Sequence, residues 1–409
     1  MPWEQDHCTA GSGMDKAISN PVVVGSQRIA HLDMDAFYAS VELLRYPHLL
    51  GLPLVIGGRR RVASDDSAQS NAAATHTKLA DYQGRGVITT ATYAARKFGV
   101  HSGMGLMQAS RLCPQAVLLP ADFDEYRRYS RRFKAAIVAL APRIEDRGID
   151  EVFIDFDAAP DGACEGGRPL AERLQSAIFA QTGLTCSIGV APNKLLAKLA
   201  SEFNKPNGIT LLEASEIATQ VWPLACAKIN GIGPKASERL GSAGIQTIGE
   251  LAQCAPHKLI EQFGRHYGHW LHEVAWGRDA RELVTASEPV SISRETTFER
   301  DLHAVRDRAE LGALFTSLCA KLAADLTRHG YVGRTISIKL RYDNFQSITR
   351  AQTLDYHTAD SAVIRRTAGL CLKRAPLQRR LRLLGVRVGG LVTTKDAPSS
   401  VEDQTLELF

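Results

Sequence analysis

The stretch Arg28-Ile-Ala-His-Leu-Asp-Met-Asp35 predicts a buried, partly alternating β-strand that ends in carboxylates. Hydrophobic spacing downstream predicts five further segments: a helix from Asp122, two short strands between 143 and 157, a helix at about 169–182, and a strand over 185–191. Strand, helix, two strands, helix and strand is the split βαββαβ order of a ferredoxin-like sheet. The sequence therefore predicts an α+β fold with a long insertion, about 37–117, after the first strand.

Three carboxylates should meet at one edge of this sheet. Asp33 lies at the end of the first strand, and Asp150 and Glu151 open the third. The first and third strands are neighbours at the centre of a ferredoxin-like sheet. Carboxylates that close repel each other and need a compensating cation, and an oxygen-rich site with few protein ligands suits Mg²⁺. Two such ions, about 3.5–4 Å apart, would suit in-line phosphoryl transfer, although any one of these acids alone is more often just a strand end or a turn.

The composition is that of a globular protein with several domains. A chain of 409 residues exceeds what one hydrophobic core usually organises, and 44% apolar with 23% charged residues excludes a disordered or fibrous chain. No apolar run is long enough for a transmembrane helix, and residues 1–26 make a poor secretory signal. The eight cysteines are scattered. We therefore expect a cytoplasmic protein with reduced thiols and no membrane association.

Positive charge is concentrated near the C-terminus. The whole chain has a net charge of +5, whereas residues 291–390 contain 18 Lys and Arg against 9 Asp and Glu, a net charge of +9. The strand predicted at 335–342 alternates strictly, with Lys339 and Arg341 on its polar face. This pattern indicates a polyanionic partner or, equally, a solvated basic surface.

A glycine-rich turn lies between these two regions. Residues 228–235, Lys-Ile-Asn-Gly-Ile-Gly-Pro-Lys, have the glycine spacing of a helix-hairpin-helix motif, with Gly231 and Gly233 in the turn. Backbone N–H groups at such a helix start can bind a phosphate. The same spacing is equally often a tight connection between two helices.

Four segments, in this order, resemble successive motifs of the Y-family translesion DNA polymerases: Asp33-Met-Asp-Ala-Phe-Tyr-Ala-Ser-Val-Glu42, Thr90-Ala-Thr-Tyr-Ala-Ala-Arg-Lys-Phe-Gly-Val100, Ile149-Asp-Glu-Val-Phe-Ile-Asp155 and Ser187-Ile-Gly-Val-Ala-Pro-Asn-Lys-Leu-Leu-Ala-Lys198. The segment Asn204-Lys-Pro-Asn-Gly208 continues the series, and the resemblance extends from about 28 to 409. It implies a right-hand polymerase with a ferredoxin-like palm, small fingers, a helical thumb and an α/β little finger.

The resemblance also implies a division of the chain. The expected parts are an N-terminal extension (1–26), palm (27–36 and 118–207), fingers (37–117, with an insertion at about 59–85), thumb (208–283), linker (284–290), little finger (291–393) and a flexible tail (394–409).

By the same resemblance, the catalytic residues and metal ligands are Asp33, Asp150 and Glu151, joined by the main-chain carbonyl of Met34, and they hold two Mg²⁺ ions. The incoming triphosphate is bound by Tyr93, Arg96 and Lys205, and Phe37 and Tyr38 lie beneath the sugar. A bulky ring at Tyr38 would exclude a ribose 2′-hydroxyl. Asp35 is acidic and close to this site, but the family pattern does not make it a ligand.

Partners are implied as well. Gly231, Gly233, Lys339 and Arg341 would contact primer–template DNA, and deoxynucleoside triphosphates would be the substrates. The last residues resemble the peptide by which bacterial polymerases bind the sliding clamp (the β subunit), with Gln404, Leu406, Leu408 and Phe409 as the contacts. Outside such a context, the same leucines would be a frayed terminus folded back on the domain. The protein is expected to be a monomer.

Two other classes of protein share part of this pattern. A catalytically silent DNA-binding relative would not need all three carboxylates, and a nucleotidyl cyclase would not need a thumb, a phosphate-binding hairpin or a basic C-terminal domain. No second acidic cluster in the sequence indicates a 3′→5′ proofreading exonuclease. We therefore expect a template-directed, low-fidelity DNA polymerase for translesion synthesis.

Overall fold

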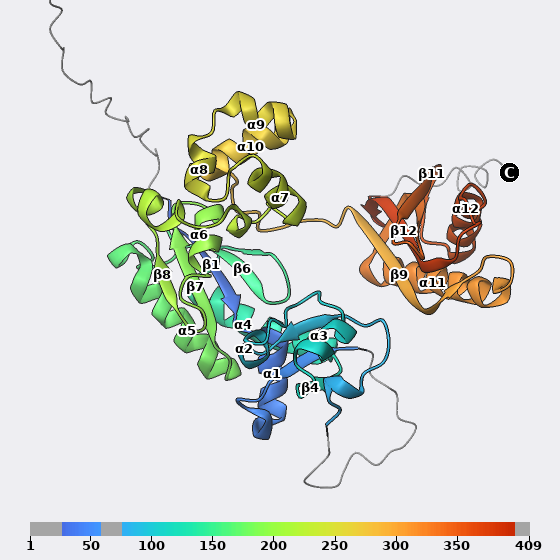
Figure 1. Ribbon diagram of the computed structural model, residues 1–409, viewed down its shortest axis with the longest axis horizontal. Coiled ribbons are helices and arrows are strands. Elements are labelled where there is room, and N and C mark those ends of the chain that lie inside the picture. The colour runs from blue at the N-terminus through green and yellow to red at the C-terminus, as the bar shows by residue number, and fades with distance from the viewer. Residues whose placement is uncertain (1–26, 59–75, 397–409) are drawn as a thin grey trace, which may run out of the picture. The chain divides into compact units, whose positions relative to one another are not determined.

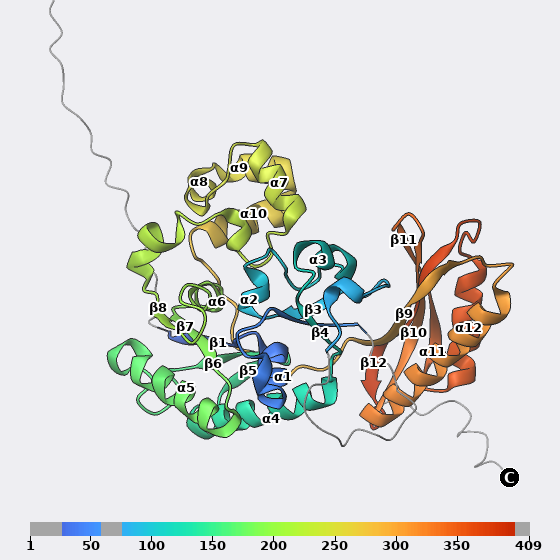
Figure 2. The same ribbon diagram turned by 60° about the horizontal axis from the view of Figure 1, so that its bottom comes forward.

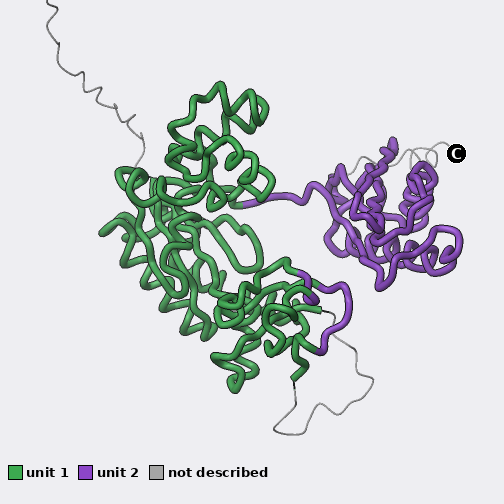
Figure 3. The backbone as a smooth tube through the Cα atoms, in the orientation of Figure 1, with its two compact units in different colours: residues 1–80, 87–104, 108–285 green, residues 81–86, 105–107, 286–409 purple. Residues whose placement is uncertain are grey.

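A computed structural model describes residues 27–58 and 76–396 of the chain (Figure 1). The chain divides into two compact units, each described by itself below: residues 1–80, 87–104 and 108–285, and residues 81–86, 105–107 and 286–409 (Figure 3).

The first unit is built on a five-stranded sheet in the order β5-β6-β1-β7-β8. Its strands are β1 (Ile29–Met34), β5 (Ile144–Asp146), β6 (Glu151–Asp155), β7 (Cys186–Ala191) and β8 (Ile209–Leu211). β1 pairs antiparallel with both β6 and β7, so the predicted neighbours are confirmed. The fifth strand, β8, pairs parallel with β7 and extends the ferredoxin-like order at one edge.

β1 is buried on both faces, which differs from the partial alternation expected from its sequence. Its Ala30, Leu32 and Met34 pack into one core with α4 (Phe123–Leu140) and α5 (Arg168–Thr182). Ile29 packs into a second core with α6 (Lys194–Ala200). Figure 2 shows α4 and α5 on one side of the sheet and α6 on the other. A central strand covered by helices on both sides has no reason to alternate.

The predicted helix from Asp122 is confirmed as α4. The Asp122 side chain caps the helix by accepting a hydrogen bond from the Glu125 N–H at 3.3 Å. Four of the side chains at helical spacing are buried in the palm core: Tyr126, Tyr129, Phe133 and Ile137.

The insertion after β1 forms a small sheet flanked by helices. Its described elements are α1 (Phe37–Arg45), the 3₁₀ turns Pro47–Leu49 and Leu79–Asp81, β2 (Leu54–Gly57), β3 (Ile88–Ala91), α2 (Tyr93–Arg96), α3 (Leu106–Leu112) and β4 (Val117–Leu119). The strand order is β3-β2-β4. The predicted insertion at about 59–85 lies only partly within the described residues.

Short helices follow the palm. They are α7 (Pro234–Ser242), α8 (Ile248–Gln253), α9 (Pro256–Phe263) and α10 (Arg265–Ala275), preceded by single turns at 214–216, 217–221 and 226–228. A further single turn, at 164–167, lies between β6 and α5. Their apolar side chains share the second core with α6. The core that covers one face of the palm sheet therefore also anchors the helical region.

The second unit is a four-stranded sheet with two helices. Its elements are β9 (Ser291–Leu302), α11 (Arg308–His329), β10 (Tyr331–Tyr342), β11 (Ser347–Thr358), α12 (Ser361–Lys373) and β12 (Leu381–Thr393), in the antiparallel order β11-β10-β12-β9. In β10, Ile336, Ile338 and Leu340 are at most 1% exposed, as predicted for the core face. On the predicted polar face, Lys339 and Arg341 are partly exposed, whereas Ser337 is buried. In the described part of the chain, no helix is long and apolar enough to cross a membrane.

Candidate active site

The pairing of β1 with β6 places the three acidic residues at one end of the sheet. Asp33 and Glu151 are directly opposite each other in this antiparallel pair. Asp150 comes just before β6, and its carbonyl accepts a hydrogen bond from the Met34 N–H at 3.0 Å. Because residues opposite each other share one face of a sheet, Asp33 and Glu151 point to the same side.

Two lysines compensate this negative charge. Lys205 Nζ lies 3.0 Å from Asp33 Oδ2, and Lys198 Nζ forms an ion pair with Glu151. Lys198 belongs to α6, and Lys205 to the loop that follows it. Within residues 27–58 and 76–396, no three acidic, histidine or cysteine side chains already converge on a single metal position. Asp33 and Glu151 are close neighbours, and each of them pairs with a lysine.

Burial and hydrogen bonding act differently on the three carboxyl groups. Burial raises the pKa of Asp33, against the opposing effect of Lys205. Burial also raises the pKa of Asp150, and the negative charge of Glu151 adds to this shift. Hydrogen bonds from His31 and Lys198 lower the pKa of Glu151 to about 2. Glu151 is therefore ionised at neutral pH, and a cation at this edge would ease the ionisation of its two neighbours.

His31 supports Glu151 from within the sheet. Its side chain is fully buried, with Nε2 3.3 Å from Glu151 Oε2 and Nδ1 2.8 Å from Ser201 Oγ. Burial lowers the pKa of His31, so the imidazole is neutral and can donate one hydrogen bond to the carboxylate. Sequence reasoning missed His31, Lys198 and Ser201. The available signal was spacing, because His31 precedes Asp33 by two residues in a strand and so shares its face.

Tyr38 lies on an aromatic platform close to these carboxylates. Its ring stacks on that of Tyr126, with centroids 4.4 Å apart and planes 23° from parallel, and Phe123 meets it edge-on at 5.9 Å. Phe37 is buried beside Tyr38, with ring centroids 5.6 Å apart. Burial and then the negative charge of Asp150 raise the pKa of Tyr38. Stacking on Tyr126 therefore fixes the Tyr38 ring at a place near Asp150.

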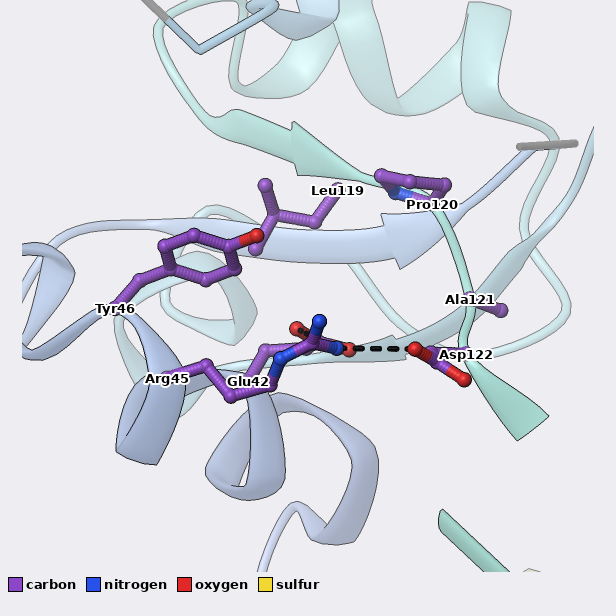
Figure 4. A pocket seen from close by; sticks show the side chains of 7 residues that line it. All are labelled: Glu42, Arg45, Tyr46, Leu119, Pro120, Ala121 and Asp122. Carbon is purple, nitrogen blue, oxygen red and sulfur yellow. Dashed lines mark hydrogen bonds and ion pairs between the residues drawn. The ribbon is translucent and has the colours of Figure 1, made fainter. Parts of the chain in front are cut away.

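The residues that line a small pocket beside Tyr38 and Tyr126 connect two helices. The pocket has a volume of about 50 Å³, far below the roughly 300 Å³ or more of a ligand site (Figure 4). Arg45 Nη1 lies 3.1 Å from Asp122 Oδ2 and 3.4 Å from Glu42 Oε2. Glu42, in turn, accepts a hydrogen bond from the Tyr126 hydroxyl at 2.8 Å. These bonds tie α1 to the start of α4 and so fix Tyr126 beneath Tyr38.

Tyr93 and Arg96 lie together on α2. The Arg96 guanidinium carbon lies 4.7 Å from the centroid of the Tyr93 ring, and Arg96 Nε donates to the Ala91 carbonyl at 3.1 Å. Burial, followed by the charge of Asp35, raises the pKa of Tyr93 to about 12. Tyr93 thus keeps its hydroxyl hydrogen at neutral pH and can donate it to an anion.

The glycine-rich turn has a close backbone approach at Gly231. Gly231 has φ +111°, its carbonyl accepts a hydrogen bond from Tyr267, and a Cβ there would collide with the Trp270 ring. Gly233 precedes α7 and has open space around it, which suits close approach of a ligand. A single 3₁₀ turn (226–228) precedes this loop in place of a regular first helix of the motif.

Two residues of the second unit were predicted to bind DNA. On β10, Lys339 Nζ pairs with Glu295 at 2.8 Å, and Arg341 Nε donates to Ser347 Oγ at 3.1 Å. Both side chains are partly exposed. The predicted clamp contacts, residues 404–409, lie outside the described residues.

Comparison with known proteins agrees with the sequence resemblance. The profile of the impB/mucB/samB family matches residues 32–202, the profile of that family's C-terminal domain matches 289–403, and that of the DNA polymerase-iota thumb domain matches 227–279. A protein called DNA polymerase IV from Methanoculleus marisnigri is 38% identical over 90% of this chain and 96% of its own length. One of the same name from Streptomyces coelicolor is 37% identical over 89% of this chain and 71% of its own.

The fold has a close match among solved structures. A chimeric Y-family DNA polymerase superposes with a TM-score of 0.73, at 23% identity, over 90% of this chain and 99% of its own. The thumb profile and the sheet order agree with this architecture. Family profiles, full-length relatives and fold converge, and the chain belongs to the Y family of DNA polymerases.

Proposed function

We propose that this Y-family DNA polymerase adds deoxynucleotides to a primer 3′-hydroxyl by two-metal phosphoryl transfer, with low fidelity and without 3′→5′ proofreading. The observation that carries this proposal is the pairing of Asp33 with Glu151 across β1 and β6, with Asp150 adjacent. Primer–template DNA and deoxynucleoside triphosphates are its substrates. We expect it to act as a monomer in the cytoplasm on damaged templates.

The donor set fits Mg²⁺. Asp33, Asp150 and Glu151 offer hard carboxylate oxygens, and the carbonyl of Met34 lies at the same end of β1. Mg²⁺ prefers a few carboxylates together with substrate phosphates. When bound, such ions supply Lewis-acid activation of a hydroxyl and neutralise charge on a triphosphate. These four residues would hold them.

The other side chains position the substrate. Lys205, Arg96 and the Tyr93 hydroxyl offer two cations and a neutral donor to the triphosphate. Tyr38, held on Tyr126, would lie under the deoxyribose and leave no room for a 2′-hydroxyl. These roles are the ones that the family resemblance implies, and the chemistry of each side chain suits its role.

Two other classes of protein fit these observations less well than a polymerase does. A nucleotidyl cyclase could share the sheet, but the matches also cover the thumb region and the C-terminal domain. A silent DNA-binding relative would not need Asp33, Asp150 and Glu151 together at one end of the β1–β6 pair. A polymerase uses all of these features.

Replacing Glu151 by Ala should lower the rate of primer extension at least about a hundredfold, because charge stabilisation at the reacting phosphate is lost. Binding of primer–template, measured by fluorescence anisotropy, should stay within about twofold, because backbone phosphate contacts dominate affinity. The matched control is Glu172→Ala on α5, whose side chain is 59% exposed and should not affect extension. Near-normal extension by Glu151→Ala would refute the two-metal assignment.

Replacing Tyr38 by Ala should admit ribonucleotides, because the obstacle to the 2′-hydroxyl is steric. The ratio of kcat/KM for deoxy- over ribonucleotide should fall by about 10- to 200-fold. Tyr38→Phe keeps the ring and should keep the ratio. If the ratio for Tyr38→Ala equals that of the wild type, Tyr38 serves only in packing.

We also propose that the C-terminal peptide tethers the enzyme to the sliding clamp. Three apolar side chains, Leu406, Leu408 and Phe409, stand in an acidic, Pro- and Ser-rich terminal segment. Tethering raises local concentration without changing the active site. Deletion of 404–409 should therefore leave synthesis without the clamp intact and remove its stimulation by the clamp. Equal stimulation of the truncated and full chains would show that the tether lies elsewhere.

A further inference from the structure

Asp35 is a buried acid that the catalytic assignment leaves without a role. Its side chain is 3% exposed, and both carboxylate oxygens are used. Oδ1 accepts a hydrogen bond from the Ser187 hydroxyl at 2.8 Å, and Oδ2 accepts one from the Asn207 N–H at 2.8 Å. Buried carboxylates are costly unless they are bonded in this way. Asp35 thus joins the end of β1 to β7 and to the loop after α6.

This loop carries Lys205. Asn207 has φ +57°, a left-handed conformation that asparagine tolerates better than most residues. The next residue, Gly208, accepts a hydrogen bond from the Ile188 N–H at 2.9 Å, and a Cβ there would collide with Asn204. The C-terminal side of the loop is therefore fixed to β7 at Gly208 and to Asp35 at Asn207.

The position of the loop decides where the Lys205 ammonium lies. Lys205 Nζ is 3.0 Å from Asp33 Oδ2, two residues along the chain from the Asn207 N–H that Asp35 holds. Asp35 also lies close to Tyr93, whose pKa its charge helps to raise. A shift of the loop would move a cation relative to the carboxylates and to Tyr93.

We propose that Asp35 is a positioning residue for the incoming nucleotide, which acts by holding the 205–207 loop so that Lys205 meets the triphosphate. This inference rests on the proposed role of Lys205. It assigns to Asp35 a hydrogen-bonding role that needs an acceptor oxygen toward Asn207 and needs no negative charge.

The Asn207 bond and the charge of Asp35 can be separated by substitution. In Asp35→Asn, the amide oxygen can accept from the Asn207 N–H while the amide nitrogen donates to the Ser187 hydroxyl, which can accept. In Asp35→Ala, both bonds are lost and the Asn207 N–H loses its acceptor. Asn should therefore rescue what Ala removes.

The experiment measures the dissociation constant of a deoxynucleoside triphosphate in complexes of the full-length enzyme with dideoxy-terminated primer–template, so that no turnover occurs. Asp35→Ala should weaken nucleotide binding about tenfold, the effect of one lost hydrogen bond that orients a charged group, and Asp35→Asn should stay within about threefold of wild type. Primer–template affinity and the thermal midpoint of each variant serve as controls for folding. If Asp35→Ala does not fold, Asp35→Ser replaces it, because its shorter hydroxyl cannot reach both partners.

The same measurement in a Lys205→Ala background tests whether Asp35 acts through Lys205. The inference predicts that Asp35→Ala has no further effect there, because the group that it positions is gone. If the fold-losses of nucleotide affinity in the two single variants multiply in the double variant, Asp35 does not act through Lys205. Such a result would overturn the role of Asp35 and leave that of Lys205 intact. Unchanged binding by Lys205→Ala alone would refute both the role of Lys205 and the inference. A loss in Asp35→Asn as large as that in Asp35→Ala would also overturn it, since charge would then be what matters.

Discussion

The antiparallel pairing of β1 with β6 is the constraint on which the site depends, because it sets Asp33 directly opposite Glu151. Side chains opposite each other in such a pair have Cβ atoms about 4.5–5.5 Å apart, and like charges there are destabilising. A slip of one residue would turn Asp33 to the other face of the sheet, so the register is as important as the residues. The pair is held in place by the buried residues that precede it in β1, which pack into cores on both sides of the sheet.

This register brings the negative charges of Asp33 and Glu151 together, and lysines from one segment of the chain balance them. Lys198 on α6 and Lys205 after it supply the cations, and α6 covers the face of the sheet to which Asp33 of β1 and Glu151 of β6 point. The same helix contributes to the core shared with α7 to α10. Packing that stabilises the palm therefore also fixes the lysines. A cluster of like charges lowers the stability of the folded protein, and such clusters are kept where function needs them.

Much of this arrangement can be predicted from the sequence. Periodicity predicts α4, α5, β7 and the alternating β10, and the ferredoxin-like order predicts that Asp33 and Glu151 are neighbours. The roles of Tyr93 and Lys205 come only from family resemblance. The spacing of His31 and Asp33 indicates only that they share a face of the strand. The bonds of His31 and Lys198 to Glu151, and the stacking of Tyr38 on Tyr126, could not be predicted, because these contacts join residues far apart in sequence. Burial of β1 on both faces is likewise a tertiary effect that local alternation does not reveal.

The most direct test of the account is to locate metal ions by the anomalous scattering of Mn²⁺ in crystals of the enzyme with dideoxy-terminated primer–template and an incoming deoxynucleotide. We expect two Mn²⁺ ions about 3.5–4 Å apart, bound by Asp33, Asp150 and Glu151. Both lysines should then have exchanged their carboxylate partners for other groups. Manganese bound only to the triphosphate, with Lys198 still paired to Glu151, would contradict the claim that these carboxylates form the catalytic metal site.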